Sequence, residues 1–179
     1  MAVPKLQLRF PCDEIAYWEK RYIEEQGDDG KVIEPGDRAR SIGYFDKPGL
    51  IEMCKWKSHR IISRCQKNSD EFIGAVTKAA LSTPCEEFRI YAPTLLRGVG
   101  WRVSSALLHF AHPEPYPIID FRALWSLSWD LDADRDDYDW EFWWTYVQFC
   151  RTVASKCGVS MRALDRALWQ YSKEKQKRS

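Results

Sequence analysis

The sequence predicts an all-α protein folded as a compact helical domain, and three observations carry this prediction. Apolar residues recur three and four positions apart along almost the whole chain, which is the spacing of an α-helix. The chain has 179 residues, 45% hydrophobic and 30% charged, which is enough to bury a core. Because no long linker interrupts this pattern, residues 1–179 are expected to form a single domain.

Three helices and one loop are predicted in the first half of the chain. The first helix ends at the turn formed by residues 27–30, and Ser69 is the expected N-cap of the third. Residues 31–46, which contain the turn-forming Pro35 and Gly36, are expected to form a loop with a short hairpin. The apolar residues that mark the three helices are Ile15, Trp18 and Tyr22, then Leu50, Ile51 and Cys54, then Phe72, Ile73, Val76 and Ala80.

Five helices are predicted in the second half. Pro84 opens the first of them, and Asp120 begins a short one that runs through Leu127. Residues 173–179 are expected to be a disordered tail. The apolar residues that mark the other four helices are Phe88, Tyr91 and Leu95, then Val103, Ala106, Leu107 and Phe110, then Phe142, Tyr146, Phe149, Cys150 and Val153, then Met161, Leu164, Leu168 and Tyr171.

The six cysteines do not have the spacing of a metal site. No two of them are separated by only two residues, so neither a structural zinc nor an iron–sulfur cluster is expected. Cys150 and Cys157 lie seven positions apart on a predicted helix and are interpreted as small buried hydrophobes rather than a redox pair. Since the chain shows no secretory signal, a disulfide framework is not expected either.

The protein is expected to be cytoplasmic, or associated with the nucleoid if it is prokaryotic. Its longest apolar runs fall far short of the roughly 20 residues that span a bilayer, so no membrane partner is expected.

The net charge of the chain is +1, but the charges are unevenly distributed. Residues 55–67 carry five basic side chains and no acid, whereas residues 130–141 carry seven acids and one arginine. The basic block (residues 55–67) can bind a polyanion, and a solvated charged face is the alternative.

Residues 96–100, Leu-Arg-Gly-Val-Gly, lie between two helical patterns and predict a tight connection between helices. Gly98 and Gly100 allow positive φ angles and the close approach of another backbone. A helix that starts near Trp101 would direct its first N–H groups and the positive end of its dipole outward, an arrangement that binds phosphate. The alternative is a plain turn between two helices that uses two glycines.

A longer stretch around this turn resembles the helix-hairpin-helix DNA glycosylase superfamily. In that superfamily an L-x-G-V-G hairpin is followed by a helix, a loop rich in glycine and proline, and an aspartate. By this resemblance the helix-hairpin-helix motif occupies residues 95–110, and a loop with three prolines but no glycine leads to Asp120 over residues 112–120. The resemblance implies a protein that binds double-stranded DNA, flips out a damaged or modified base and excises it, as in DNA repair.

The resemblance also implies that Asp120 is the catalytic residue. A carboxylate near C1′ can stabilise the positive charge that builds on the sugar as the base leaves, and it can activate a water molecule. Bifunctional members carry a lysine 18 residues before this aspartate, and here that position is Arg102. Because a guanidinium cannot form a Schiff base, a monofunctional glycosylase that leaves an abasic site is expected. The alternatives are an N-cap role for Asp120 and a phosphate contact or a salt bridge for Arg102.

Further candidate residues would contact the DNA backbone and the extruded base. Aromatic rings can stack on an extruded base, and the candidates for this substrate contact, with Arg102, are Tyr44, Trp56 and Trp101. The expected DNA-binding residues are Lys55, Lys57, Ser58, Arg60 and Arg64 in the basic block and Gly98, Val99 and Gly100 in the hairpin. Since the family's lysine position is Arg102 here, Lys57 is the one lysine considered as a nucleophile in its place.

The tryptophans expected to pack in the core are Trp18, Trp125, Trp140, Trp143, Trp144 and Trp169, and Trp129 has no assignment.

The acids at positions 130, 132, 134, 136 and 141 match a calcium-loop template, but Arg135 stands where that loop needs glycine. A solvated acidic loop is expected instead, with no metal and no cofactor.

The expected function is that of a monomeric, monofunctional DNA glycosylase. The alternatives are a non-catalytic, structure-specific DNA-binding module and a protein-interaction domain that does not bind DNA.

Overall fold

The structure is a computed structural model that describes residues 6–129 and 138–176. Within these residues every regular element is a helix, as predicted, and none of the helices has the length and apolar character needed to cross a membrane. The sequence predicts one domain over residues 1–179, and the chain groups into two compact units. The inserted unit is Asp29–Pro115, and the discontinuous unit combines Met1–Asp28 with Tyr116–Ser179.

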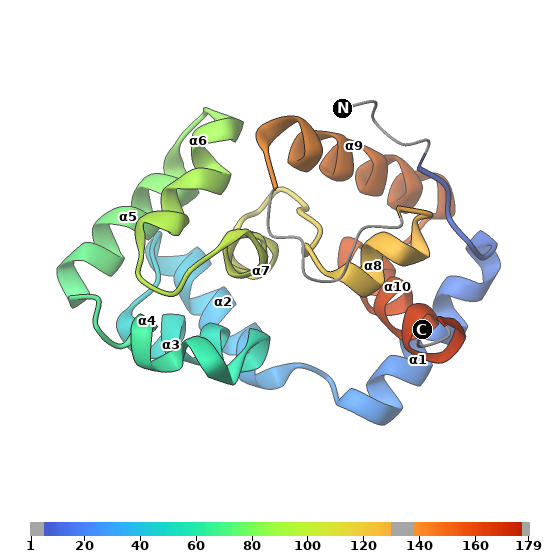
Figure 1. The fold of residues 1–179 in the computed structure, drawn as a ribbon, viewed down its shortest axis with the longest axis horizontal. Helices are drawn as coiled ribbons and strands as arrows, with labels where there is room; N and C mark the ends of the chain where they lie inside the picture. The colour runs from blue at the N-terminus through green and yellow to red at the C-terminus, as the bar shows by residue number, and fades with distance from the viewer. Residues whose placement is uncertain (1–5, 130–137, 177–179) are drawn as a thin grey trace. The chain divides into compact units, whose positions relative to one another are not determined.

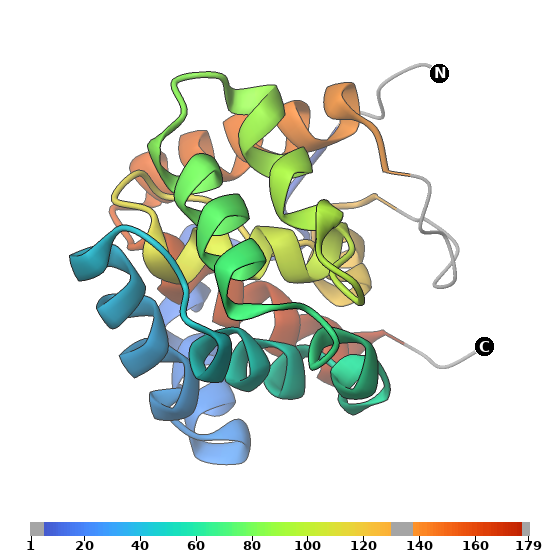
Figure 2. The same cartoon turned by 90° about the vertical axis from the view of Figure 1, so that its left-hand side faces the viewer.

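The inserted unit holds the basic block and the candidate hairpin. Its helices are α2 (Gly30–Ile42), α3 (Lys47–Lys57), η2 (His59–Ile61), α4 (Ile62–Cys65), α5 (Asp70–Ser82), α6 (Glu86–Tyr91), η3 (Ala92–Leu95) and α7 (Trp101–Ala111). α2 packs beside α3 and α7, and α5 packs beside α6 and η3 (Figures 1 and 2). Ser69 is the N-cap of α5, as predicted, because its hydroxyl accepts a hydrogen bond from Phe72 N at 3.3 Å.

Residues 30–42 form α2, and the prediction of a loop with a short hairpin over residues 31–46 is therefore wrong. Val32, Gly36 and Ala39 are buried on one face of this helix. A Cβ atom on Gly36 would lie 2.6 Å from Phe110 Cβ on α7, so glycine is needed for the two helices to approach. Pro35 and Gly36 thus mark a close helix contact rather than a turn.

The helix predicted over residues 84–95 is shorter than expected, and its predicted apolar face is exposed. Phe88, Tyr91 and Leu95 have exposed fractions of 45%, 38% and 63%. Helix α6 ends at Tyr91 and continues as the 3₁₀ turn η3. The residues buried instead are Arg89 and Ile90 in α6 and Ala92 and Pro93 in η3, so the buried face of this segment is not the predicted one.

The discontinuous unit is assembled from both ends of the chain. Its helices are η1 (Cys12–Glu14), α1 (Ile15–Gln26), α8 (Phe121–Ser126), α9 (Trp140–Cys157) and α10 (Met161–Lys175). α10 packs against both α1 and α8 (Figure 1). Ahead of α1, Gln7 N and Arg9 N donate to Leu127 O and Ser126 O at 3.0 Å each, so the N-terminal segment is bonded to the end of α8.

The predicted disordered tail over residues 173–179 is wrong for its first part, because α10 continues through Lys175. Lys173 Nζ lies 2.6 Å from Glu25 Oε2 on α1, and Lys175 Nζ lies 5.6 Å from the ring centroid of Trp18. These contacts hold the last turn of the helix on α1. Residues 177–179 lie outside the described residues, as do residues 130–137 of the predicted acidic loop.

The tryptophans divide differently from the prediction. Trp18 and Trp143 are buried as expected, and Trp129, which had no assignment, is also buried, with its ring centroid 4.4 Å from that of Phe142. The tryptophans that were expected in the core but are only half-buried are Trp125, Trp140, Trp144 and Trp169. Trp140 and Trp144 stack on each other along α9 at 5.2 Å, so part of the aromatic content covers helix surfaces.

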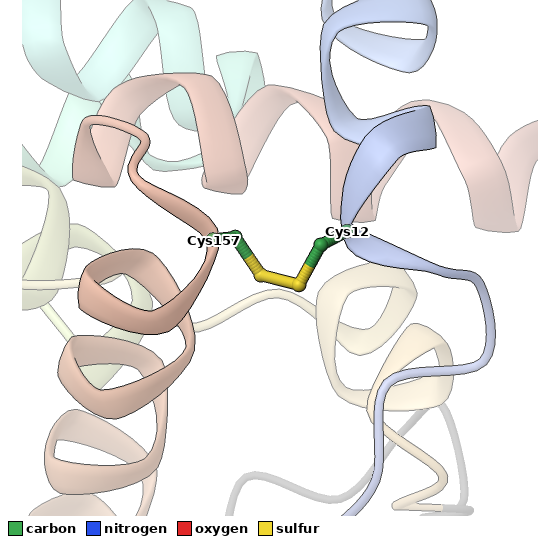
Figure 3. The surroundings of a disulfide bond; sticks show 2 residues. All are labelled: Cys12 and Cys157. Atoms are coloured by element: carbon green, nitrogen blue, oxygen red, sulfur yellow. A yellow bond between two sulfur atoms is a disulfide. The ribbon is translucent and has the colours of Figure 1, made fainter.

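Cys157 forms a disulfide with Cys12, which corrects its interpretation as a small buried hydrophobe and the expectation that disulfides are absent. The bridge joins the start of η1 to the last residue of α9, with the two Cα atoms 5.3 Å apart (Figure 3). The pairing connects residues 145 positions apart in the sequence, which spacing alone does not reveal. Cys150 is a buried free thiol, as predicted.

We expect Cys157→Ser to lower the free energy of unfolding by about 2–4 kcal/mol, because the bridge restricts the unfolded chain over a long loop. Urea unfolding without reductant measures this difference. Cys85→Ser, which changes an exposed free cysteine, is the matched control and should leave stability unchanged. Equal stability of wild type and Cys157→Ser under these conditions would contradict the prediction.

Candidate functional site

The candidate hairpin, residues 96–100, connects η3 to α7 by a tight turn. Val99 N donates to Leu96 O at 3.0 Å, and Gly98 has a φ of +84°, in the left-handed region that favours glycine. The N–H groups of Val103 and Ser104 both donate to Gly100 O, which begins α7. Among the described residues no side chain forms a cap hydrogen bond at the start of this helix.

Asn68, which follows the basic block directly, joins the hairpin to that block. Its Oδ1 accepts a hydrogen bond from Arg97 N at 2.9 Å, and its Nδ2 donates to Arg97 O and Cys65 O at 3.0 and 2.9 Å. The amide is 4% exposed, so these bonds are shielded from water. Nothing in the local sequence around Asn68 indicates a partner 29 residues away, so this residue could not be predicted from the sequence.

The hairpin also touches the basic block through Gly98. A Cβ atom there would lie 2.8 Å from Cys65 Sγ and 3.0 Å from Arg64 Cβ. The backbone of the hairpin therefore lies directly against Arg64 and Cys65. The hairpin and the basic block, which the sequence analysis treats separately, are in contact in the inserted unit, and Asn68 and Gly98 form that contact.

The side chains of the basic block differ in how they are held. Arg60 and Arg64 are exposed, and neither forms an ion pair with another described residue. Lys55 pairs with Glu52 at 2.6 Å, and Lys57 Nζ lies 5.7 Å from the ring centroid of Trp56. Ser58 ends α3 and precedes η2, which carries His59 and Arg60. Arg60 and Arg64, together with the exposed Lys67 at the end of the block, are thus available to a polyanion.

The three aromatic candidates each pack on a different neighbour. Trp56 is half-buried, with its ring edge-on to Phe110 at 5.5 Å and its Nε1 donating to Asp29 Oδ1 at 3.3 Å. Trp101, at the start of α7, packs edge-on against Tyr91 at 4.8 Å. Tyr44 is exposed in the α2–α3 connection, where its ring lies over Gly74. Trp101 is the aromatic candidate that directly follows the hairpin.

Asp120 lies in the discontinuous unit, whereas the hairpin and the half-buried Arg102 lie in the inserted unit. The Asp120 carboxylate is half-buried and caps α8, with Oδ1 accepting a hydrogen bond from Arg122 N at 3.0 Å. This is the N-cap role that the sequence analysis gave as the alternative to catalysis. A carboxylate has two oxygens with about four acceptor positions, so an N-cap bond does not by itself exclude a second role.

The proline-rich loop that leads to Asp120 begins at His112. The imidazole is buried, and its Nδ1 accepts a hydrogen bond from Glu114 N at 3.1 Å. Burial, with a further contribution from the Arg89 guanidinium, lowers the pKa of His112 below its ordinary value. The neutral ring therefore accepts the hydrogen bond from Glu114 N at the start of the loop.

Within the described residues no group of three or more His, Cys, Asp or Glu side chains is placed to hold a metal ion.

We expect Gly98→Ala to destabilise the protein by at least about 1–2 kcal/mol, because alanine is strained at a φ of +84° and its Cβ would collide with Cys65 Sγ. Gly100→Ala is the matched control, since Gly100 has a φ of −105° and open space around it. Chemical denaturation of both variants measures the difference. An equal loss in both variants would show that the close hairpin contact is unimportant.

Comparison with known proteins finds no matching family, no matching curated protein and no matching solved structure.

Proposed function

We propose that the protein binds duplex DNA through the hairpin and the basic block of the inserted unit and removes a damaged or modified base as a monofunctional DNA glycosylase. The observation that carries the proposal is the bonding of the hairpin to the basic block by Asn68. This contact holds the hairpin, which leads into α7, against the segment that carries the exposed Arg60 and Arg64.

Such a surface suits a phosphate backbone for two separate reasons. The uncapped start of α7 offers backbone N–H groups and the positive end of a helix dipole. The two arginines add mobile positive charges that neutralise phosphates and release their counterions. Neither contribution reads the base sequence, so this surface would position DNA rather than select a site.

The chemistry would be carried by Asp120. In hydrolysis of an N-glycosidic bond, the oxygen of a water molecule bonds to C1′ as the bond from C1′ to the base nitrogen breaks. The base leaves with the bonding electron pair and takes up a proton from solvent, and the sugar becomes an abasic site. A carboxylate stabilises the cationic sugar, accepts a proton from the attacking water and returns it to solvent, so that overall one proton passes from the water to the base. Because Arg102 offers no amine nucleophile, the strand stays uncut.

A second candidate function is that of a DNA-binding module without catalysis. The hydrogen bond from Arg122 N to Asp120 Oδ1 favours it, because a cap role alone accounts for an aspartate at this position. The two functions share the DNA-binding surface and differ only in what Asp120 does. Substitution of Asp120 by asparagine separates them, since asparagine is also a good N-cap.

We expect the wild-type protein to leave alkali-sensitive abasic sites in duplex DNA that carries its modified base, without cutting the strand before alkali treatment. Asp120→Asn should reduce abasic-site formation by at least about 100-fold while its thermal stability stays close to that of wild type. Gel analysis of end-labelled duplexes from a panel of damaged and hypermodified bases measures this. Full activity in Asp120→Asn would rule out the catalytic role, and inactivity of wild type across the panel would favour the second candidate.

We expect the double variant Arg60→Gln/Arg64→Gln to bind duplex DNA more weakly and with a shallower dependence on salt. Loss of two phosphate contacts should reduce the slope of log affinity against log salt by about 2. Fluorescence anisotropy at several salt concentrations measures both quantities. Lys20→Gln, which removes an exposed charge on α1, is the matched control. An unchanged slope in the double variant would place the DNA-binding surface elsewhere.

A further inference from the structure

The loop before Asp120 is fixed by side chains from two other helices. Its backbone can form few hydrogen bonds of its own, because Pro113, Pro115 and Pro117 have no N–H group. The hydroxyl of Tyr146 on α9 donates to Ile118 O at 2.9 Å. Ile118 N donates to Asp165 Oδ1 on α10 at 3.4 Å. Both polar groups of Ile118 are therefore held by side chains.

These two bonds lie where water cannot replace them. Ile118 and Tyr146 are almost fully buried, and Asp165 is 8% exposed. A buried carbonyl or N–H that loses its partner costs more than the bond itself contributes, so this arrangement is strongly preferred over a looser one. The Arg162 guanidinium binds Asp165 Oδ2, which leaves Oδ1 directed at Ile118 N.

The hydroxyl of Tyr146 is kept as a proton donor by its surroundings. Burial raises the pKa of Tyr146 well above its ordinary value, and the nearby Cys150 thiol and the carboxylates of Asp165 and Asp120 act in the same direction. The phenol is therefore held in its protonated form more firmly than an ordinary tyrosine, and at neutral pH it donates to Ile118 O.

The backbone that follows Asp120 is fixed as well. Asp120 Oδ1 binds Arg122 N at the start of α8, and Ser126 Oγ at the end of α8 donates to Leu168 O at 2.6 Å. Leu168 lies one turn after Asp165 on α10. A single helix, α10, thus holds the chain on both sides of Asp120.

We propose that Tyr146 and Asp165 are positioning residues that hold the Asp120 carboxylate in place by fixing the Ile118 peptide two residues before it. This inference rests on the proposed glycosylase function for its catalytic consequence. Only Ile119, which is fully buried, separates the held peptide from Asp120. In this role the phenol and the carboxylate of these two residues act through the position of Asp120 rather than on the substrate.

The test compares Tyr146→Phe with wild type in single-turnover base excision. Loss of the hydroxyl frees Ile118 O, and the rate at saturating protein should fall by about tenfold, since small misplacements of a reacting group lower rates strongly. The protein concentration that gives half the maximal rate should not change, because the proposed DNA contacts lie in the inserted unit. Asp165→Ala, which removes the acceptor of Ile118 N, should have the same effect.

Tyr171→Phe is the matched control. Its hydroxyl also donates to a backbone carbonyl of the discontinuous unit, Arg9 O at 3.2 Å, so the variant loses the same kind of bond away from Asp120. Equal rates in Tyr146→Phe and Tyr171→Phe would overturn the positioning role. A fall in Tyr146→Phe alone supports it.

Amide hydrogen exchange separates this inference from the proposed function. Loss of the Tyr146 hydroxyl should loosen the segment from Ile118 to Asp120. The N–H of Ile118, bound to Asp165, and the N–H of Arg122, bound to Asp120, should therefore exchange faster in Tyr146→Phe than in Tyr171→Phe. If wild type forms no abasic sites but this difference is seen, the glycosylase proposal fails and the fixing of Asp120 stands. If exchange at both amides is unchanged, the positioning role is overturned whatever the activity.

Discussion

The pairing of α1 with α10 is the contact on which the discontinuous unit depends, because it joins the two ends of the chain around an insertion of 87 residues, Asp29 to Pro115. Ion pairs line this contact: Arg21 with Glu174 at 3.2 Å, Lys173 with Glu25 at 2.6 Å and Arg166 with Glu19 at 3.1 Å. Most of these groups are partly exposed, so they direct the register of the two helices more than they stabilise them. The stability comes from the apolar face beneath, where Trp18, Leu164 and Leu168 are buried.

Once α10 is held in this way, it becomes the support for the loop that carries Asp120. Asp165 and Leu168 accept bonds from the segments before and after that residue, so the position of the carboxylate follows from the position of one helix. In the inserted unit the corresponding support is Asn68, whose amide fixes the hairpin against the end of the basic block. Both proposed functional segments are irregular backbone held by buried side chains of regular elements, which is how a loop can be rigid without being a helix.

The helices were largely predictable because an amphipathic face repeats locally. The positions of Ile15, Trp18 and Tyr22 mark α1, and Ser69 marks the start of α5 through its own hydrogen bond. Prediction failed where the same residue type occurs in two different structural settings. Pro35 and Gly36 resemble a turn but lie within a helix that approaches Phe110, and the apolar residues of the 84–95 segment lie on its exposed side. The proposed site was predictable only in its local parts, the hairpin and the cap at Asp120. Asn68, Tyr146 and Asp165 act across the chain on partners 28 to 47 residues away, and no local pattern encodes such contacts.

The bond between Cys12 and Cys157 turns most of this chain into a covalent ring. The whole inserted unit, the loop that leads to Asp120 and the segment between α8 and α9 all lie within that ring, with only the residues before 12 and after 157 outside it. A protease that cuts one peptide bond anywhere in the ring opens it but releases no fragment while the disulfide is intact. The loops that would be most exposed to cleavage can thus be cut once without the two ends of the protein separating, so in an oxidising environment a nicked molecule can keep its fold.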